Sequence, residues 1–361
     1  MFGSLRLLLA FMVVFSHLPG SDYLVHFGFY AVRGFFVISG FVITAGLQEI
    51  YHFDGKRFWV NRLLRLLPPY IVVCLVTLLA VSWFPSEAAT YLRSWRPDST
   101  ALETVLNLLV IPLEYSETHF RLVPPYWSVA VELQMYALLF IAGARNERLA
   151  LATLWFGLVY HLACISSNLD FTARYHAAPS AALSFAAGAV IYFWCKRGAL
   201  EVTPSAAALA LVMWLANTVA ADSALNDEYA YGPGYYFGTF LFVVVIAGLS
   251  RIEVASLTRR IDQALGELAY PVFLVQWLAG FVTALALGSS EWRGWTLTFA
   301  SLPLILIMAI ALTLLNRRLI EPLRQQWRRA PLHPEPVTRS GVGAGDPACQ
   351  TVASSVTGGI G

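Results

Sequence analysis

Two residues of the first apolar segment, Arg6 and His17, have the spacing of a functional pair. Ten residues separate them, so eleven helical steps bring both side chains onto one face, about 16 Å apart along the axis. A cation near one membrane surface and a titratable imidazole deeper in the bilayer suit a long phosphorylated donor, whose reactive end would reach the imidazole. The alternative is an anchoring arginine and a histidine that only packs, and the spacing favours neither.

A second group of polar side chains lies on one face of a later apolar segment. Ser128, Glu132 and Tyr136 are spaced by four residues, which places them on one side of a helix. Trp127 is typical of a membrane interface. A carboxylate inside the bilayer needs a partner, and we predict that Glu132 lies at the depth of His17 and forms with it a general acid–base pair. A structural ion pair or hydrogen-bond network is the alternative.

Three further arginines could bind an anion. Arg62 and Arg65 share a helix face at the predicted inner boundary, where guanidinium groups can hold phosphate in a bidentate manner or act only as positive-inside anchors. Arg33 lies about a third of the way into a predicted span and needs an acidic partner, water or an anionic ligand, unless it snorkels to the outer interface. Gly34 and Gly40 beside it permit close helix packing.

Helices in a membrane must position these side chains. The chain is 58% hydrophobic and only 13% charged, against about 25% charged residues in average soluble domains. So few charges cannot cover a water-facing surface, and the predicted fold class is all-α, a polytopic membrane protein. Ten segments approach the length of about 20 residues that a spanning helix needs. They are 3–19, 25–47, 69–84, 126–143, 149–166, 178–195, 204–220, 235–249, 264–287 and 295–316.

The distribution of basic residues predicts that both termini are cytoplasmic, because most Lys and Arg then fall in inside loops. The long outside loop 85–125 contains a short apolar piece, Val105–Leu113, which should lie on the membrane or pack on the helix bundle. Residues 1–329 form the membrane-embedded domain, and 317–329 suits a helix at the inner surface. Residues 330–361 are rich in Pro, Gly, Ser and Thr and are predicted to be a disordered cytoplasmic tail.

Some partners are not indicated. The net charge of +2 does not suggest a nucleic acid, and the four cysteines form no C-x-x-C pair. Neither a disulfide framework nor a metal site is therefore predicted.

The ordered motifs resemble those of the membrane-bound acyltransferase-3 family, which O-acylates sugars of surface polysaccharides and lipopolysaccharide. The resemblance covers about residues 5–325. It rests on six segments in order: Arg6 with His17, Gly34 to Phe41, Phe58 with Arg62, Arg65 and Pro68, Trp127-Ser128 with Glu132 and Tyr136, Leu265 to Leu274, and Ile320-Glu321-Pro322.

The resemblance implies transfer of an acyl group, most often acetyl, from acyl-CoA to a hydroxyl of a carbohydrate or glycolipid. It implies that Arg6, Arg62 and Arg65 meet the CoA phosphates and that His17 is the base or a transient acyl acceptor, with Glu132 as its partner. Arg33, Trp127, Ser128 and Tyr136 would support the substrates. It further implies a bacterial inner-membrane location, with acetyl-CoA as a donor substrate and no permanently bound cofactor.

Departures from the family pattern bear on the substrate more than on the reaction. Arg33 stands where the family often has an acidic residue, and Gln276 stands where it commonly has a histidine. Three alternatives stay open: succinyl transfer, a transporter or flippase of a lipid-linked glycan, and a non-catalytic partner in polysaccharide assembly. Direct transfer and an acyl-enzyme are equally compatible with the residues.

Overall fold

The computed structural model describes residues 2–20, 24–95, 99–111, 120–223, 227–252, 255–288 and 292–328. Within these ranges every regular element is a helix. The predicted all-α class is therefore confirmed, and so is a polytopic membrane protein, because eight of the described helices are long and apolar enough to cross a membrane. The predicted tail, 330–361, lies outside the described residues.

Each of the ten predicted segments coincides with a helix. They are α1 (Phe2–His17), α2 (Val25–Gly46), α3 (Gly55–Trp83), α6 (Tyr126–Leu138), α7 (Glu147–Ser166), α9 (Ala178–Lys196), α10 (Pro204–Ser223), α12 (Pro233–Leu249), α13 (Ser256–Leu287) and α14 (Trp295–Leu319). Two π-helical turns, η1 (Leu47–Tyr51) and η2 (Leu139–Gly143), extend α2 and α6. Five short helices complete the described part of the fold: α4 (Pro85–Tyr91), α5 (Ala101–Leu108), α8 (Phe171–Tyr175), α11 (Asp227–Tyr231) and α15 (Glu321–Arg328).

Two of the ten matched helices are short for a membrane span. The 16 residues of α1 and the 17 of α12 reach about 24–26 Å, less than the roughly 30 Å of a hydrocarbon core. The start of α3 was also predicted wrongly, because the helix begins at Gly55 and runs through Pro68 and Pro69. Hydropathy detects only the apolar part of a helix, whereas the capping bond from Arg57 N to the Asp54 carboxylate, 3.0 Å, starts this one earlier.

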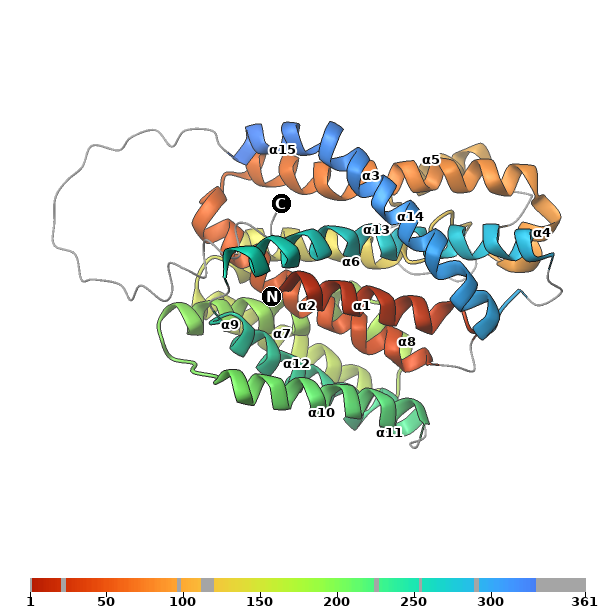
Figure 1. Ribbon diagram of the computed structural model, residues 1–361. Coiled ribbons are helices and arrows are strands. Elements are labelled where there is room, and N and C mark those ends of the chain that lie inside the picture. The colour runs from red at the N-terminus through yellow and green to blue at the C-terminus, as the bar shows by residue number, and fades with distance from the viewer. Residues whose placement is uncertain are drawn as a thin grey trace.

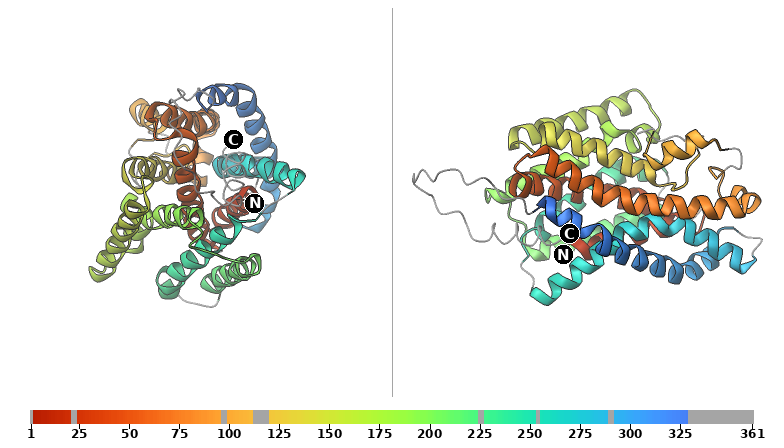
Figure 2. Two further views of the ribbon diagram at one scale, coloured as in Figure 1. Left: turned by 90° about the vertical axis from the view of Figure 1, so that its left-hand side faces the viewer. Right: turned by 90° about the horizontal axis from the view of Figure 1, so that it is seen from above.

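The long helices run roughly alongside one another, with α1 and α2 in the middle of the bundle (Figure 1). Helices α3, α14 and α15 lie on one side of this centre, and α7, α9, α10 and α12 lie on the other, as the end-on view also shows (Figure 2). α2 contacts both α1 and α9, and α1 contacts α13. The central pair therefore joins the two halves.

Glycines at helix crossings allow the central contacts. A Cβ added to Gly3 of α1 would lie 1.7 Å from the Asp262 carbonyl oxygen of α13, and one added to Gly266 would lie 2.8 Å from Gly3 Cα. The side chain of Asp262 also accepts bonds from the backbone N–H groups of Gly3 and Ser4, both at 2.9 Å. α1 is thereby held against α13 with two of its first-turn donors satisfied.

The predicted packing role of Gly40 is confirmed where α2 crosses α9. A Cβ on Gly40 would lie 2.0 Å from the Phe185 carbonyl oxygen, and one on Gly188 would lie 2.2 Å from the Val37 carbonyl oxygen. No side chain fits between the two backbones here, as expected for small residues at a membrane helix interface.

The apolar piece predicted in the loop 85–125 packs on the bundle as α5. Tyr70 Oη, in the middle of α3, donates to the carbonyl of Asn107 at 2.8 Å. The Asn107 side chain in turn donates to Phe120 O at 2.6 Å and accepts from Leu122 N at 3.0 Å. This buried asparagine satisfies irregular backbone inside the bundle, and α6 consequently begins in the interior.

The interior start of α6 corrects the predicted interfacial position of Trp127. This residue is only 7% exposed, and its ring packs against those of Tyr175 and His176, with centroids 5.1 and 4.5 Å away.

Candidate functional site

Five helices, α1, α2, α3, α6 and α13, line a cavity that contains most of the sequence-predicted polar residues. Its empty volume, including the open mouth, is about 820 Å³, within the range of small-molecule sites. Ser128, Glu132 and Tyr136 all line it from α6, which confirms their predicted common face. The remaining charged residues on its wall are Arg6 on α1 and Arg62 and Arg65 on α3.

Three guanidinium groups and one carboxylate therefore share this cavity. Arg6 lies close enough to Arg65, Glu132 and Arg62 for their charges to interact. Arg62 is 1% exposed, and its guanidinium lies against the rings of Tyr51 and Phe58. Cations outnumber anions on the cavity wall, so the site attracts an anionic group, and arginine forks suit phosphate oxygens.

Glu132 is held by two hydroxyl groups. Ser39 Oγ of α2 donates to its carboxylate at 3.0 Å, and Tyr136 Oη donates to the same oxygen. In the sequence, Ser39 is only one position of the Gly34 to Phe41 segment. Its bond to Glu132 depends on the approach of two helices, which spacing within one helix does not reveal.

The predicted pair of Glu132 with His17 is wrong. Ser16, next to His17, lies level with Gly28 of α2, where an added Cβ would be 2.4 Å from Ser16 Oγ. Ser39, which binds Glu132, lies eleven residues further along α2, or about 16 Å. Glu132 is therefore at the level of Arg6. The prediction failed because it measured the depth of Glu132 from an outer membrane surface, whereas α6 begins inside the bundle.

The partners of His17 come from α13 instead. His17 Nδ1 lies 3.1 Å from Gln276 Oε1, and the imidazole packs on the Trp277 ring with centroids 5.2 Å apart. Arg293, beyond the end of α13, is near enough for its charge to act on His17. Sequence reasoning singled out Gln276 only as a departure from a family pattern, and nothing in the spacing pointed to Arg293.

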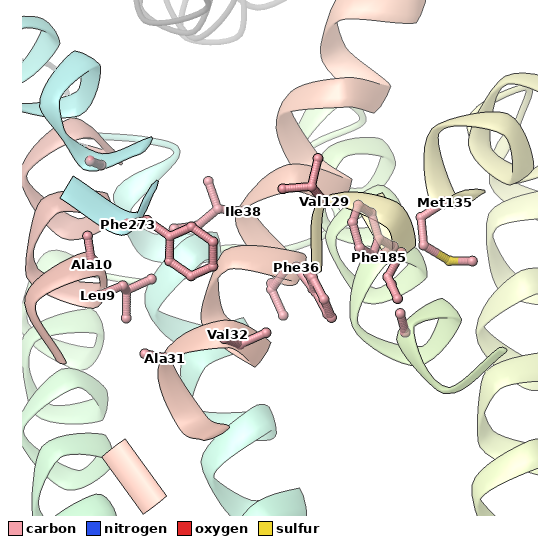
Figure 3. Close-up of a cluster of buried hydrophobic side chains, with 14 of the residues drawn as sticks. Leu9, Ala10, Ala31, Val32, Phe36, Ile38, Val129, Met135, Phe185 and Phe273 are labelled. Atoms are coloured by element: carbon pink, nitrogen blue, oxygen red, sulfur yellow. The ribbon is translucent and has the colours of Figure 1, made fainter. Parts of the chain in front are cut away.

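An aromatic pair separates the cavity from His17. Phe35 and Phe273 both line the cavity, and their rings meet edge to face with centroids 6.3 Å apart. Figure 3 shows Phe273 between Leu9 of α1 and Ile38 of α2. Gln276, which contacts His17, follows Phe273 on α13 by less than one helical turn. His17 therefore lies just beyond this aromatic pair.

Arg33 lies away from the cavity and joins helices. Its guanidinium donates to the carbonyls of Ser180 at 3.0 Å and Arg174 at 2.5 Å and lies over the Tyr235 ring at 4.8 Å. At 2% exposure it does not snorkel to an interface. Carbonyl oxygens take the place of the acidic partner, water or anionic ligand that the sequence led us to expect.

A second cavity adjoins the first at the predicted cytoplasmic end, with about 520 Å³ of empty volume. Arg65 and Tyr270 line both cavities, and Tyr270 Oη donates to Leu66 O at 3.0 Å across the boundary. Arg317 and Arg324 add cations to the second cavity, balanced by Glu267 and Glu321.

The helix predicted near 317–329 closes this second cavity as α15. Arg324 is 1% exposed and donates to the Glu321 carboxylate at 2.7 Å. Asn61 Nδ2 donates to the Arg324 carbonyl at 3.2 Å, which fixes α15 to α3. Burial, together with the nearby charge of Arg65, lowers the pKa of Arg324 to about 10, so this guanidinium stays charged at neutral pH.

The fold and these two cavities define a helical membrane protein with a buried, basic binding site. The sequence model of the acyltransferase-3 family, described as an acyltransferase domain, matches residues 3–315. The chain belongs to this family, and it is a membrane acyltransferase. No curated protein and no solved structure matches the chain.

Proposed function

We propose that this acyltransferase transfers an acyl group, most often acetyl, from acyl-CoA to a hydroxyl of a cell-surface or exported carbohydrate. The observation that carries the proposal is the basic cavity formed by Arg6, Arg62 and Arg65 around Glu132, with His17 beyond its far end. A CoA thioester has the matching order of groups, with phosphates at one end and a reactive carbonyl at the end of a long, thin arm.

The proposed donor path starts at the predicted cytoplasmic end. Arg65 lines both adjoining cavities, so the phosphates of CoA would bind there and at Arg6, and the arm would extend toward the Phe35–Phe273 pair. Arg6 and His17 are about 16 Å apart along α1, which requires an extended donor. The acyl end has to pass the two rings to reach the imidazole.

In the proposed reaction His17 acts as a general base. The sugar hydroxyl oxygen bonds to the thioester carbonyl carbon while its proton passes to His17 Nε2. The carbon–sulfur bond then breaks, and the imidazolium returns the proton to the CoA thiolate. Because His17 ends α1, at the predicted outer end, an acceptor on the outer side can meet a donor from the cytoplasm.

Glu132 then has a different role from the one the sequence suggested. Among three arginines, its carboxylate offsets part of the cost of burying positive charge in the membrane domain. Its negative charge also opposes the phosphates of CoA, which keeps the product from binding too tightly. Ser39 and Tyr136 hold the carboxylate in this position.

Mass spectrometry of surface glycans tests the proposal directly. Cells that lack the protein should lose about one acyl group per glycan repeat, and the mass lost identifies acetyl or succinyl. Complementation with His17→Ala should leave acylation lowered by about 10²–10⁴-fold, the usual contribution of general acid–base catalysis, while a fluorescent fusion shows normal insertion. Unchanged acylation together with lost glycan export would support a transporter, and full acylation by His17→Ala would remove His17 from the chemistry.

A further inference from the structure

The Gln276 side chain lies between His17 and a backbone carbonyl. Its Oε1 is 3.1 Å from His17 Nδ1, and its Nε2 donates to Phe273 O at 2.9 Å. The residue is completely buried and belongs to α13, whose Gly266 allows α1 to pack closely. Its orientation is therefore set by contacts on both sides.

This arrangement determines which nitrogen of His17 carries the proton. A carbonyl oxygen can only accept, so the Gln276 amide group must face Phe273, and the Gln276 oxygen must face the imidazole. An oxygen at Nδ1 requires that Nδ1 carry a hydrogen. In the neutral ring, Nε2 is then unprotonated, and no described group forms a hydrogen bond with it.

We propose that Gln276 is a positioning residue, which holds His17 as the Nδ1–H tautomer and leaves Nε2 as the base. Its catalytic consequence rests on the proposed acyl transfer, but the tautomer itself does not. The role is the one the sequence assigned to Glu132, since a partner at one nitrogen of a histidine fixes the tautomer and the ring orientation.

The other groups around His17 are consistent with a neutral imidazole. Trp277 packs on the ring from α13, and Gly28 of α2 faces the neighbouring Ser16. The charged group whose field acts on His17 is Arg293, which lies over the Trp277 ring at 4.6 Å. A cation opposes protonation of the imidazole, and an amide at Nδ1, unlike a carboxylate, does not counteract it.

Nitrogen NMR of the protein in lipid nanodiscs tests the tautomer without any activity measurement. With ¹⁵N-histidine, the resonance lost in His17→Ala identifies His17, and its shifts distinguish Nδ1–H from Nε2–H. We expect Nδ1–H in the wild type and a shift toward Nε2–H in Gln276→Leu, which removes the acceptor at similar volume. The matched control is Thr283→Val, because Thr283 is also on α13 and, within the described residues, its side chain bonds only to Ala279 O.

Two results would overturn the proposal: an Nε2–H tautomer of His17 in the wild type, or no change in Gln276→Leu. Should Gln276→Leu not fold, Gln276→Glu replaces it, and its oxygen should retain the Nδ1–H form. The six other histidine resonances report whether each variant is folded.

Kinetics separate positioning from structure. Gln276→Leu should lower kcat about 10–100-fold, the loss typical when a metal-bound histidine loses the partner of its other ring nitrogen, with little change in KM for acyl-CoA. Gln276→Glu should recover part of this loss, and Thr283→Val should behave as the wild type. A Gln276→Leu variant with the altered tautomer and full kcat would refute the catalytic role. Absence of acyl transfer in the wild type would contradict the proposed function and leave the NMR result standing.

Discussion

Replacement of the two opposite charges in the basic cavity should change CoA affinity in opposite directions. Arg6 and Glu132 line the same cavity and interact electrostatically. If CoA phosphates bind there, Arg6→Gln removes an attractive partner, whereas Glu132→Gln removes a like charge from the neighbourhood of the phosphates. If Glu132 were instead the catalytic partner of His17, its replacement would not strengthen CoA binding, and the two changes would not act in opposite directions.

The size of each effect follows from the charges involved. A hydrogen bond to a charged group contributes about 1.5–3 kcal/mol, so Arg6→Gln should weaken CoA binding by roughly 10–150-fold. Like charges held together cost up to several kcal/mol. Since Ser39 and Tyr136 already disperse the charge of Glu132, we expect about 1 kcal/mol and a roughly fivefold tighter complex for Glu132→Gln.

Isothermal titration of CoA into the protein in nanodiscs measures both changes. Arg260→Gln is the control, because Arg260 is an exposed arginine at the same predicted membrane face and lines neither cavity. Weaker CoA binding by Glu132→Gln, in a variant that melts like the wild type, would refute the assignment of the carboxylate to the phosphate end. Equal binding by wild type and Arg6→Gln would place the donor elsewhere.

Three further predictions concern packing, donor choice and topology. Gly40→Ala should destabilise the protein by about 1–3 kcal/mol through overpacking and lower its melting temperature. The control is Gly46→Ala on the same helix, whose new Cβ has no neighbour within 3.4 Å and should not lower it. Equal melting temperatures of the two variants would disprove the close crossing. Phe273→Leu should widen the passage to His17 and raise the kcat/KM ratio of succinyl-CoA to acetyl-CoA by roughly tenfold, and an unchanged ratio would show that the ring does not limit the acyl group. Reporter fusions at Asp227 and Gly361 should give opposite signals, since the basic residues place these sites on opposite sides.

The sequence by itself determined the fold class, the positions of the helices and the common face of Ser128, Glu132 and Tyr136. These features follow from local regularities, namely apolar length and the helical period. The ends were less well determined, as α3 shows, because hydropathy cannot detect a helix that continues through charged residues at the membrane surface.

Only the tertiary structure decided which residues meet. Glu132 joined Arg6 and not His17 because Asn107 and Tyr70 hold α5 and the backbone at Phe120 and Leu122 inside the bundle, so that α6 begins there. Gln276 reached His17 because α1 packs closely on α13. Both outcomes depend on the relative depth of different helices, which is set by long-range contacts and by interior loops, and the spacing of residues within one helix contains no information about it.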